Sequence, residues 1–96
     1  MKKYIPCEKH WIDMFAQYAM FKVIEKFPLR MIRKKKLINS LDTGAVLYML
    51  SNFNKEAWMP LTLNEQNFLI DGQHRLELAK QMCLEYIDVI IQSKPN

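Results

Sequence analysis

The stretch Phe68-Leu69-Ile70-Asp71-Gly72-Gln73-His74-Arg75 places an apolar run directly before an Asp-Gly pair and two side chains that can carry positive charge. The residues that follow, 76–84, form an amphipathic segment. This order predicts a strand, a tight turn and a helix. The first backbone N–H groups of such a helix lack intrahelical partners and lie at the positive end of the helix dipole. We therefore expect a phosphate-sized anion site at this turn.

Three residues of the turn have properties that suit an anion. Gly72 lets the backbone adopt a positive φ, or lets a ligand approach closely, because it has no Cβ. His74 and Arg75 lie in the first predicted helical turn, where they add hydrogen-bond donors and positive charge. The structural alternative is a salt bridge from Arg75 to Asp71 or Glu77, with His74 capping the turn.

Asp71 precedes the glycine and has two interpretations of its own. As the N-cap of the helix, its side chain would accept a hydrogen bond from the first turn and contribute roughly 1 kcal/mol. As a functional group, it would hold Mg²⁺ or act as a general base beside a phosphate. We expect the cap, because nothing in the spacing of the other carboxylates identifies a partner for catalysis.

The stretch Gly72-Gln73-His74-Arg75 resembles the signature of the ParB/sulfiredoxin superfamily, in which a strand runs into Gly-x-x-Arg or Gly-x-His-Arg at a helix start. With Asp71 in front, it is also similar to the DGQHR-domain proteins associated with DNA sulfur modification. The resemblance covers residues 57–92. It implies that Gly72, Gln73, His74 and Arg75 hold the phosphates of a nucleoside triphosphate, ATP or CTP, with Mg²⁺ as an accompanying ion.

Two departures from the superfamily pattern narrow the expected activity. Sulfiredoxin has a cysteine immediately before His-Arg, and this chain has Gln73 there, so sulfiredoxin activity is not expected. The partition proteins carry an upstream Gln-Pro-Arg loop and a helix-turn-helix DNA-binding domain, and neither is visible in these residues. The resemblance therefore implies the nucleotide-binding domain alone.

Two functional classes stay open on this basis. The first is a nucleotide-binding domain, with NTP hydrolysis or phosphotransfer in a DNA-associated process; Asp71 and His74 are its candidate catalytic residues. The second is a non-catalytic regulator or inhibitor from a phage or other mobile element that binds DNA or a protein. The intact turn favours the first class, whereas the short chain and the missing loop and cysteine favour the second.

Positive charge is concentrated in the first half of the chain. Residues 1–48 contain ten Lys or Arg and four Asp or Glu, whereas residues 49–96 contain four and six, within a formal net charge of +4. The densest part of the first half contains Arg30, Arg33, Lys34, Lys35 and Lys36. Such a cluster can bind nucleic acid by releasing counterions, and it can equally be a solvated helix face.

Length and composition predict one soluble domain, residues 1–96. Half of the residues are apolar, which is sufficient for a single modest core. No run approaches the ~20 consecutive apolar residues of a membrane-spanning helix, and charged residues interrupt the sequence after the Met-Lys-Lys start. We expect a cytoplasmic protein without a membrane partner. Cys7 and Cys83 lack the spacing of a zinc site and are expected to be buried or partly buried free thiols.

The first part of the domain, residues 1–53, is predicted to be mainly helical and basic. Apolar residues recur at three- and four-residue spacing from 8 to 26, the pattern of an amphipathic helix that a proline then ends. A second helix, with Pro28 at its first position, is predicted to stop near Gly44, and a short third helix over 45–53 follows. The superfamily resemblance instead favours a strand around 21–32, and the sequence leaves both readings open.

The second part, residues 57–92, completes an α+β domain with a small mixed sheet. Strands at 58–63 and 68–70 flank four polar residues suited to a hairpin loop. Pro60 has no N–H for a ladder, so its strand should lie at an edge or begin there. A helix over 73–84 then leads to a β-branched run at 86–92, which is expected to be a mostly buried strand.

Overall fold

A computed structural model describes residues 3–34 and 42–93, so Lys35 and Lys36 of the basic run lie outside the described residues. Within these ranges no helix is both long and apolar enough to cross a membrane. The elements, in chain order, are α1 (Lys9–Ala16), β1 (Phe21–Pro28), a 3-10 helix (Leu29–Met31), α2 (Thr43–Ser51), a second 3-10 helix (Lys55–Ala57), β2 (Leu61–Asn64), β3 (Leu69–Asp71), α3 (Gln73–Gln81) and β4 (Tyr86–Gln92).

Strand β4 is the centre of a four-stranded mixed sheet with the order β1-β4-β2-β3. It pairs antiparallel with β1 and parallel with β2, while β2 and β3 form the antiparallel hairpin. Residues 87–90 of β4 are all buried, so side chains on both faces of the strand are covered. The predicted α+β class, the mixed sheet and the buried strand at 86–92 are confirmed.

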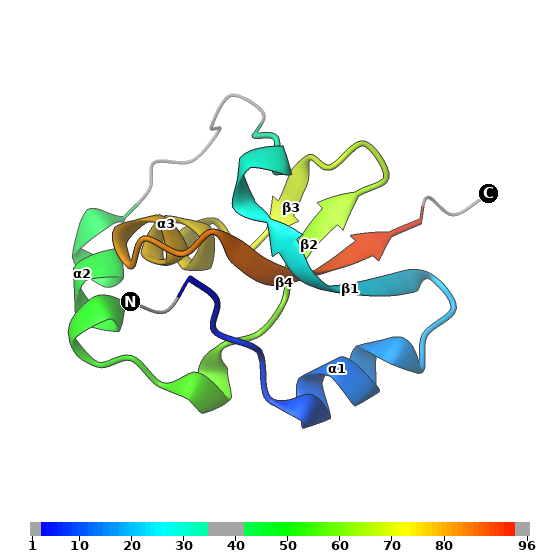
Figure 1. The fold of residues 1–96 in the computed structure, drawn as a ribbon, viewed down its shortest axis with the longest axis horizontal. Coiled ribbons are helices and arrows are strands. Elements are labelled where there is room, and N and C mark those ends of the chain that lie inside the picture. Colours follow the sequence, from blue (N-terminus) through cyan, green and yellow to red (C-terminus); the bar gives the residue numbers. More distant parts are fainter. Residues whose placement is uncertain (1–2, 35–41, 94–96) are drawn as a thin grey trace.

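The hairpin of β2 and β3 leads directly into the turn that precedes α3. Asn64 organises the loop: its Oδ1 accepts the amides of Gln66 at 2.9 Å and Phe68 at 3.0 Å. Strand β2 begins at Leu61, immediately after Pro60, as the missing proline N–H requires. In Figure 1, α3 lies beside α2 at one end of the sheet, and α1 lies next to β1 at another side. The predicted strand, turn and helix are confirmed.

The predicted helix over 8–26 is wrong in its second half. Helix α1 ends at Ala16, and residues 21–28 form β1. Without β1, one edge of the buried strand β4 would have unpaired backbone N–H and C=O groups. The hydrogen bonds between β1 and β4 therefore outweigh the weak helical pattern of residues 21–28. A bulge between Ile24 and Phe27, with Lys26 at φ 57°, interrupts the ladder. The strand that the superfamily resemblance favours is therefore the correct alternative.

The second predicted helix, from Pro28 to near Gly44, is also wrong where the structure describes it. Residues Leu29–Met31 form a single 3-10 turn, and Arg33 then makes a parallel bridge to Phe68 at the outer edge of β3. Gly44 lies inside α2 instead of ending a helix. The third helix is confirmed as α2, whose N-cap Asp42 accepts the amide of Ala45 at 3.1 Å. The first part of the domain is thus mixed rather than mainly helical.

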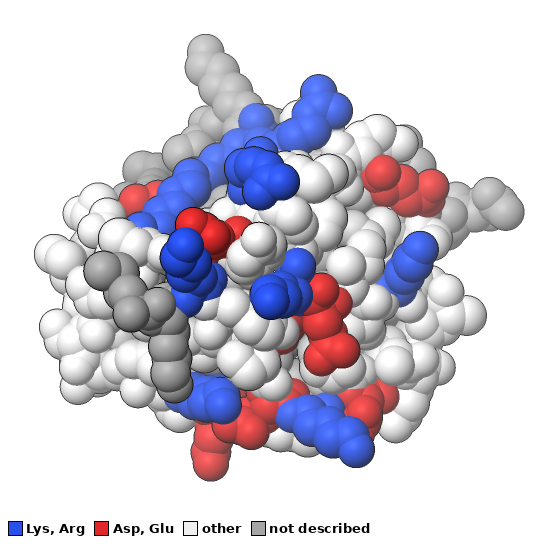
Figure 2. All heavy atoms as spheres, viewed as in Figure 1, with Lys and Arg blue, Asp and Glu red and all other residues white. Residues whose placement is uncertain are grey.

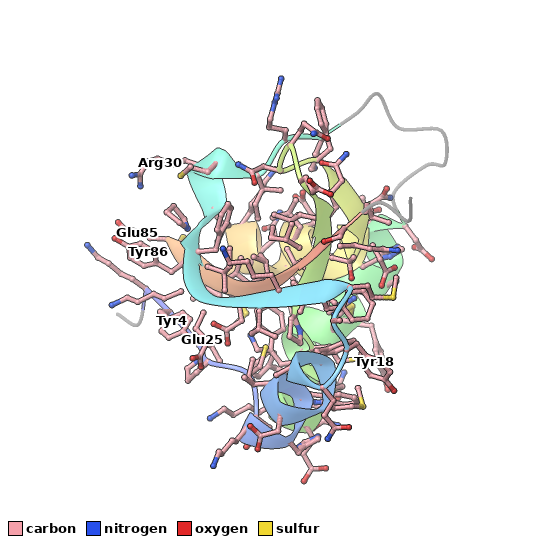
Figure 3. The ribbon with its side chains drawn as sticks, turned by 90° about the vertical axis from the view of Figure 1, so that its right-hand side faces the viewer. Tyr4, Tyr18, Glu25, Arg30, Glu85 and Tyr86 are labelled. Atoms are coloured by element: carbon pink, nitrogen blue, oxygen red, sulfur yellow. The ribbon has the colours of Figure 1, made fainter. Side chains whose placement is uncertain are left out.

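A buried carboxylate ties the N-terminal segment to the sheet. Asp88 is fully buried, and it accepts hydrogen bonds from the Tyr4 hydroxyl at 2.5 Å, the Cys7 amide at 2.7 Å and the Lys26 amide at 2.9 Å. Tyr4 and Tyr86 lie side by side at this end of the sheet (Figure 3). This cluster was not predicted from the sequence, although a lone carboxylate inside the β-branched run was a usable signal.

The two cysteines differ in exposure. Cys7 is buried in the core, where desolvation and the neighbouring Asp88 carboxylate raise the pKa of its thiol well above the usual range. Its thiol is therefore protonated at neutral pH and is a poor nucleophile. Cys83 is exposed, so the expectation of burial is wrong for that residue. Both are free thiols, as predicted.

Candidate anion-binding turn

Gly72 has both properties that the turn needs. Its φ of +106° lies in the left-handed region, which a side chain would disfavour. A Cβ at this position would also lie 2.4 Å from Cδ2 of Leu61 on β2. The positive φ confirms the sequence prediction. The close neighbour that excludes a side chain at Gly72 is Leu61, a core residue of the protein itself, because the turn packs directly on the start of β2.

Arg75 folds back onto the protein. Its Nη1 donates to the carbonyls of Met59 at 2.9 Å and Pro60 at 3.0 Å, and its Nη2 donates to Asp71 at 3.2 Å. The side chain is only 14% exposed, and burial lowers the pKa of the guanidinium while the Asp71 charge raises it. The structure therefore shows the salt bridge to Asp71 rather than to Glu77. Arg75 anchors the segment that enters β2, and this leaves two of its five N–H groups for other partners.

Asp71 does not cap α3, so that prediction is wrong. Gly72 occupies the N-cap position, and no side chain of the described residues caps the helix. The Asp71 carboxylate is 75% exposed and accepts from Arg75 instead, because Asp71 is the last residue of β3 and precedes the cap by one position. The first helical hydrogen bond runs from the Leu76 amide to the Gly72 carbonyl at 2.8 Å. Helix geometry leaves the amides of residues 73–75 without intrahelical partners, as an anion site requires.

His74 contributes an unpaired polar atom at the same helix end. Its Nε2 is buried and has no hydrogen-bond partner among the described residues. Buried polar atoms are normally paired, and an unpaired one calls for a ligand, an ion or a water. The alternative in which His74 caps the turn is not observed.

Arg33, one of the basic residues that the structure describes, lies at the outer edge of β3. The Arg33 amide donates to the Asn67 carbonyl and the Arg33 carbonyl accepts the Leu69 amide, both at 2.8 Å. The Arg33 guanidinium lies 4.3 Å from the centre of the Phe68 ring, a cation–π contact. Because the bridge is parallel, the chain at Arg33 runs in the same direction as β3, which leads to Gly72. The alternative of a solvated helix face is therefore wrong for Arg33 and Lys34, whereas Arg30 is an exposed residue of the 3-10 helix.

Other cations lie near this edge. Lys34 is close to Lys80 of α3. Burial and the Lys80 ammonium both lower the pKa of Lys34, whereas the Glu77 carboxylate raises it. Lys80 was not predicted as part of this group, because its proximity to Lys34 depends on the tertiary structure. Arg30 projects from the 3-10 helix away from the sheet (Figure 3). On the face of the molecule that Figure 2 shows, several Lys and Arg side chains lie along the upper part.

The described residues contain no group of three or more His, Cys, Asp or Glu side chains that could hold a metal ion. Among the carboxylates named above, Asp71 is the one next to the turn in sequence, and its exposure leaves it accessible. An Mg²⁺ ion at this turn would therefore have to take most of its ligands from nucleotide phosphates and water, as Mg²⁺ often does.

Comparison with known proteins supports the fold. No family model matches this sequence, and no curated protein matches it significantly. Among solved structures, sulfiredoxin from Arabidopsis thaliana is similar, with a TM-score of 0.62 and 20% identity over 76% of this chain and 86% of that chain. The pNOB8-like ParB N-domain is similar with a TM-score of 0.58 and 14% identity, over 81% of this chain. A second crystal form of that domain gives a TM-score of 0.55.

The strand order, the glycine turn and the helix that follows it define an α+β domain built around a strand–turn–helix unit. This is the ParB/sulfiredoxin-like fold, as the sequence resemblance implied. The chain spans only 30% of the ParB chain that it resembles. At these identities the likeness concerns the fold.

Proposed function

We propose that this protein binds the phosphates of a nucleoside triphosphate, ATP or CTP, at the N-terminus of α3. The observation that carries the proposal is the combination of uncapped helix amides with the buried, unpaired Nε2 of His74. Backbone N–H groups of Gln73 and His74 would hold phosphate oxygens, and the His74 imidazole would add a hydrogen bond. Arg75 would act mainly by holding the turn in shape, because three of its donors already have protein partners.

The experiment is a calorimetric titration of the protein with ATP, CTP and GTP, with and without Mg²⁺. We expect binding, and we expect His74→Ala to weaken it about 10- to 100-fold, the range for a hydrogen bond to a charged group. His10→Ala is the matched control, because His10 lies on α1, is exposed and should leave affinity unchanged. No heat signal and no thermal shift at millimolar nucleotide would contradict the proposal.

Hydrolysis or phosphotransfer is the second step of this proposal. It needs a carboxylate that holds Mg²⁺ or orients the attacking group, and Asp71 is the candidate. Released phosphate is measured for wild type and Asp71→Asn, with and without DNA. An enzyme should lose turnover in Asp71→Asn but keep nucleotide binding; a binding module should release no phosphate in either form.

A second candidate function, a regulator or inhibitor from a mobile element, rests on the basic edge. Arg33 and Lys34 are exposed there, Lys34 lies close to Lys80, and Arg30 is exposed on the neighbouring 3-10 helix. Lys35 and Lys36 belong to the same run in sequence. These residues would contact nucleic-acid phosphates, which requires no base-specific recognition. A protein partner with an acidic surface is the other ligand that this edge would suit.

This second candidate predicts salt-dependent binding to duplex DNA. The logarithm of the affinity should fall with the logarithm of the salt concentration, with a slope of about −0.9 for each phosphate neutralised. Lys34→Glu should make the slope shallower by about one phosphate or more. Lys22→Glu, on the opposite edge strand β1, is the matched control and should change it less. Absence of binding at low salt would leave the basic edge without a role in nucleic-acid recognition.

A further inference from the structure

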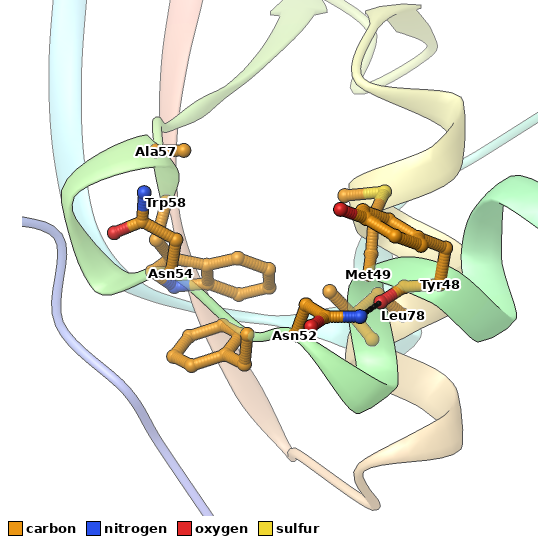
Figure 4. Close-up of a pocket in the computed structure, with 8 residues that line it drawn as sticks. Tyr48, Met49, Asn52, Asn54, Ala57, Trp58 and Leu78 are labelled. Atoms are coloured by element: carbon orange, nitrogen blue, oxygen red, sulfur yellow. Dashed lines mark hydrogen bonds between the residues drawn. The ribbon is translucent and has the colours of Figure 1, made fainter.

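A cavity of about 140 Å³ lies between α2 and the second 3-10 helix (Figure 4). Tyr48 and Met49 of α2 line one side of it, and Ala57 and Trp58 line the other. Tyr48 is 70% exposed and Ala57 is exposed as well, so the cavity opens to the surface. A cavity of about this size accepts a single six-membered ring such as benzene. Its two facing sides therefore suit a flat ring.

The walls of this cavity are apolar and partly aromatic. The Phe53 and Trp58 rings lie edge to face, with their centroids 5.4 Å apart, and Leu78 of α3 also lines the cavity. None of the described residues that line it carries a charge. The cavity therefore suits the neutral, planar part of a ligand. A nucleobase meets this requirement, because every base has a π-face that can stack on aromatic side chains.

Two asparagines supply hydrogen-bonding groups for the edge of such a ring. The Asn52 Nδ2 donates to the Tyr48 carbonyl at 3.1 Å, and the Asn54 Oδ1 accepts the Glu56 amide at 3.0 Å. The Asn52 Oδ1 and the Asn54 Nδ2 have no hydrogen-bond partner among the described residues. The lining thus offers one acceptor and one donor, which suit the polar edge of a heteroaromatic base better than a hydrocarbon ring.

The cavity adjoins the turn that precedes α3. Leu78 follows His74 by one helical turn, and residues four apart on a helix project from the same face with about 5–6 Å between their Cβ atoms. On the other side of the cavity, Met59 directly follows Trp58, and its carbonyl accepts Nη1 of Arg75 at 2.9 Å. Both sides of the cavity are therefore connected to residues of the turn. The ribose of a nucleotide spans a distance of this order between the base and the first phosphate.

We propose that this cavity holds the base of the nucleotide whose phosphates bind at the N-terminus of α3, an inference that rests on the proposed function. The base would lie between Tyr48 on one side and Phe53 and Trp58 on the other. Its polar edge would form hydrogen bonds with Asn52 and Asn54. The uncharged cavity would thus receive the neutral end of the ligand, while the uncapped helix amides receive the charged end.

The experiment is a calorimetric titration of the full chain with ATP, with CTP and with inorganic tripolyphosphate, which has no base. We expect the better of the two nucleotides to bind about 5- to 150-fold more tightly than tripolyphosphate, the range for stacking one base on aromatic side chains. Tyr48→Ala removes one side of the cavity and Ala57→Leu fills part of it. Both variants should weaken nucleotide binding and leave the affinity for tripolyphosphate unchanged.

Two further variants serve as comparisons. Tyr18→Ala is the matched control, because Tyr18 is 52% exposed and lies beyond the end of α1, so both affinities should stay as in the wild type. His74→Ala should weaken tripolyphosphate and nucleotide alike, since it acts on the phosphate end. Thermal denaturation checks that the cavity variants fold, which the exposure of Tyr48 and Ala57 leads us to expect.

The outcomes separate the base site from the phosphate site. Equal affinities for nucleotide and tripolyphosphate in the wild type would overturn the base site and leave the proposed phosphate site standing. Nucleotide binding that both cavity variants leave unchanged would have the same meaning. A wild-type protein that binds neither ligand would overturn the proposed function, and the base site with it.

Discussion

Replacing Asp88 with alanine should lower the free energy of unfolding by about 3–5 kcal/mol, the largest effect that we expect of a single substitution here. The carboxylate is fully buried and accepts three hydrogen bonds, from the Tyr4 hydroxyl and the amides of Cys7 and Lys26. Removing it leaves buried donors unpaired on two segments that are distant in sequence. The N-terminal segment and the bulge of β1 would each lose a hydrogen bond to the sheet, because both donate to this one side chain.

Urea denaturation of the two proteins measures this effect. Asp88→Asn should fall between wild type and Asp88→Ala, because its amide keeps one acceptor and adds an NH₂ group that faces other donors. Glu85→Ala is the control for charge: its carboxylate pairs with Lys3 at 3.4 Å, but both side chains are more than half exposed, so a change below about 1 kcal/mol is expected. An Asp88→Ala variant that loses less free energy of unfolding than Glu85→Ala would show that water replaces the Asp88 carboxylate.

Replacing Arg75 with alanine should lower the free energy of unfolding by about 2–4 kcal/mol. The substitution removes both donors to the carbonyls of Met59 and Pro60, which precede β2, and it removes the partner of Asp71. The side chain also packs beside Gly72, since Nη2 would lie 3.2 Å from a Cβ built there. Loss of Arg75 should therefore loosen the turn and the start of β2 together.

The stability of Arg75→Ala is measured by urea denaturation next to Lys80→Ala, a control on the same helix whose exposed side chain should contribute less than about 0.5 kcal/mol. Arg75→Lys should recover only part of the loss, because an ammonium cannot reproduce the fork that reaches two carbonyls and a carboxylate. A fully stable Arg75→Ala variant would contradict the anchoring role. Arg75 would then be available to a ligand, as the superfamily resemblance first implied.

The features that sequence predicted correctly have local causes. The loop between β2 and β3 depends on Asn64 and the polar residues beside it, and the α3 turn depends on a glycine that can adopt a positive φ. The β-branched density of 86–92 favours a buried strand in almost any context. Helix α2 follows from its capping Asp42 and its apolar residues. Each of these signals lies within a few residues of the structure that it determines.

The tertiary structure decided everything that depends on partners far away in the chain. The apolar residues of 21–28 have helical spacing, yet this segment forms β1. The reason is strand β4, more than sixty residues later, whose backbone N–H and C=O groups need partners along this edge. Asp71 meets the requirements of a cap, but the turn places the cap at Gly72 and the carboxylate on Arg75. Arg75 finds its acceptors at Met59 and Pro60, and Asp88 finds one of its donors at Tyr4, 84 residues away. Local spacing cannot encode such pairs, because hydrogen bonds and burial act through space and form only when the whole chain has folded.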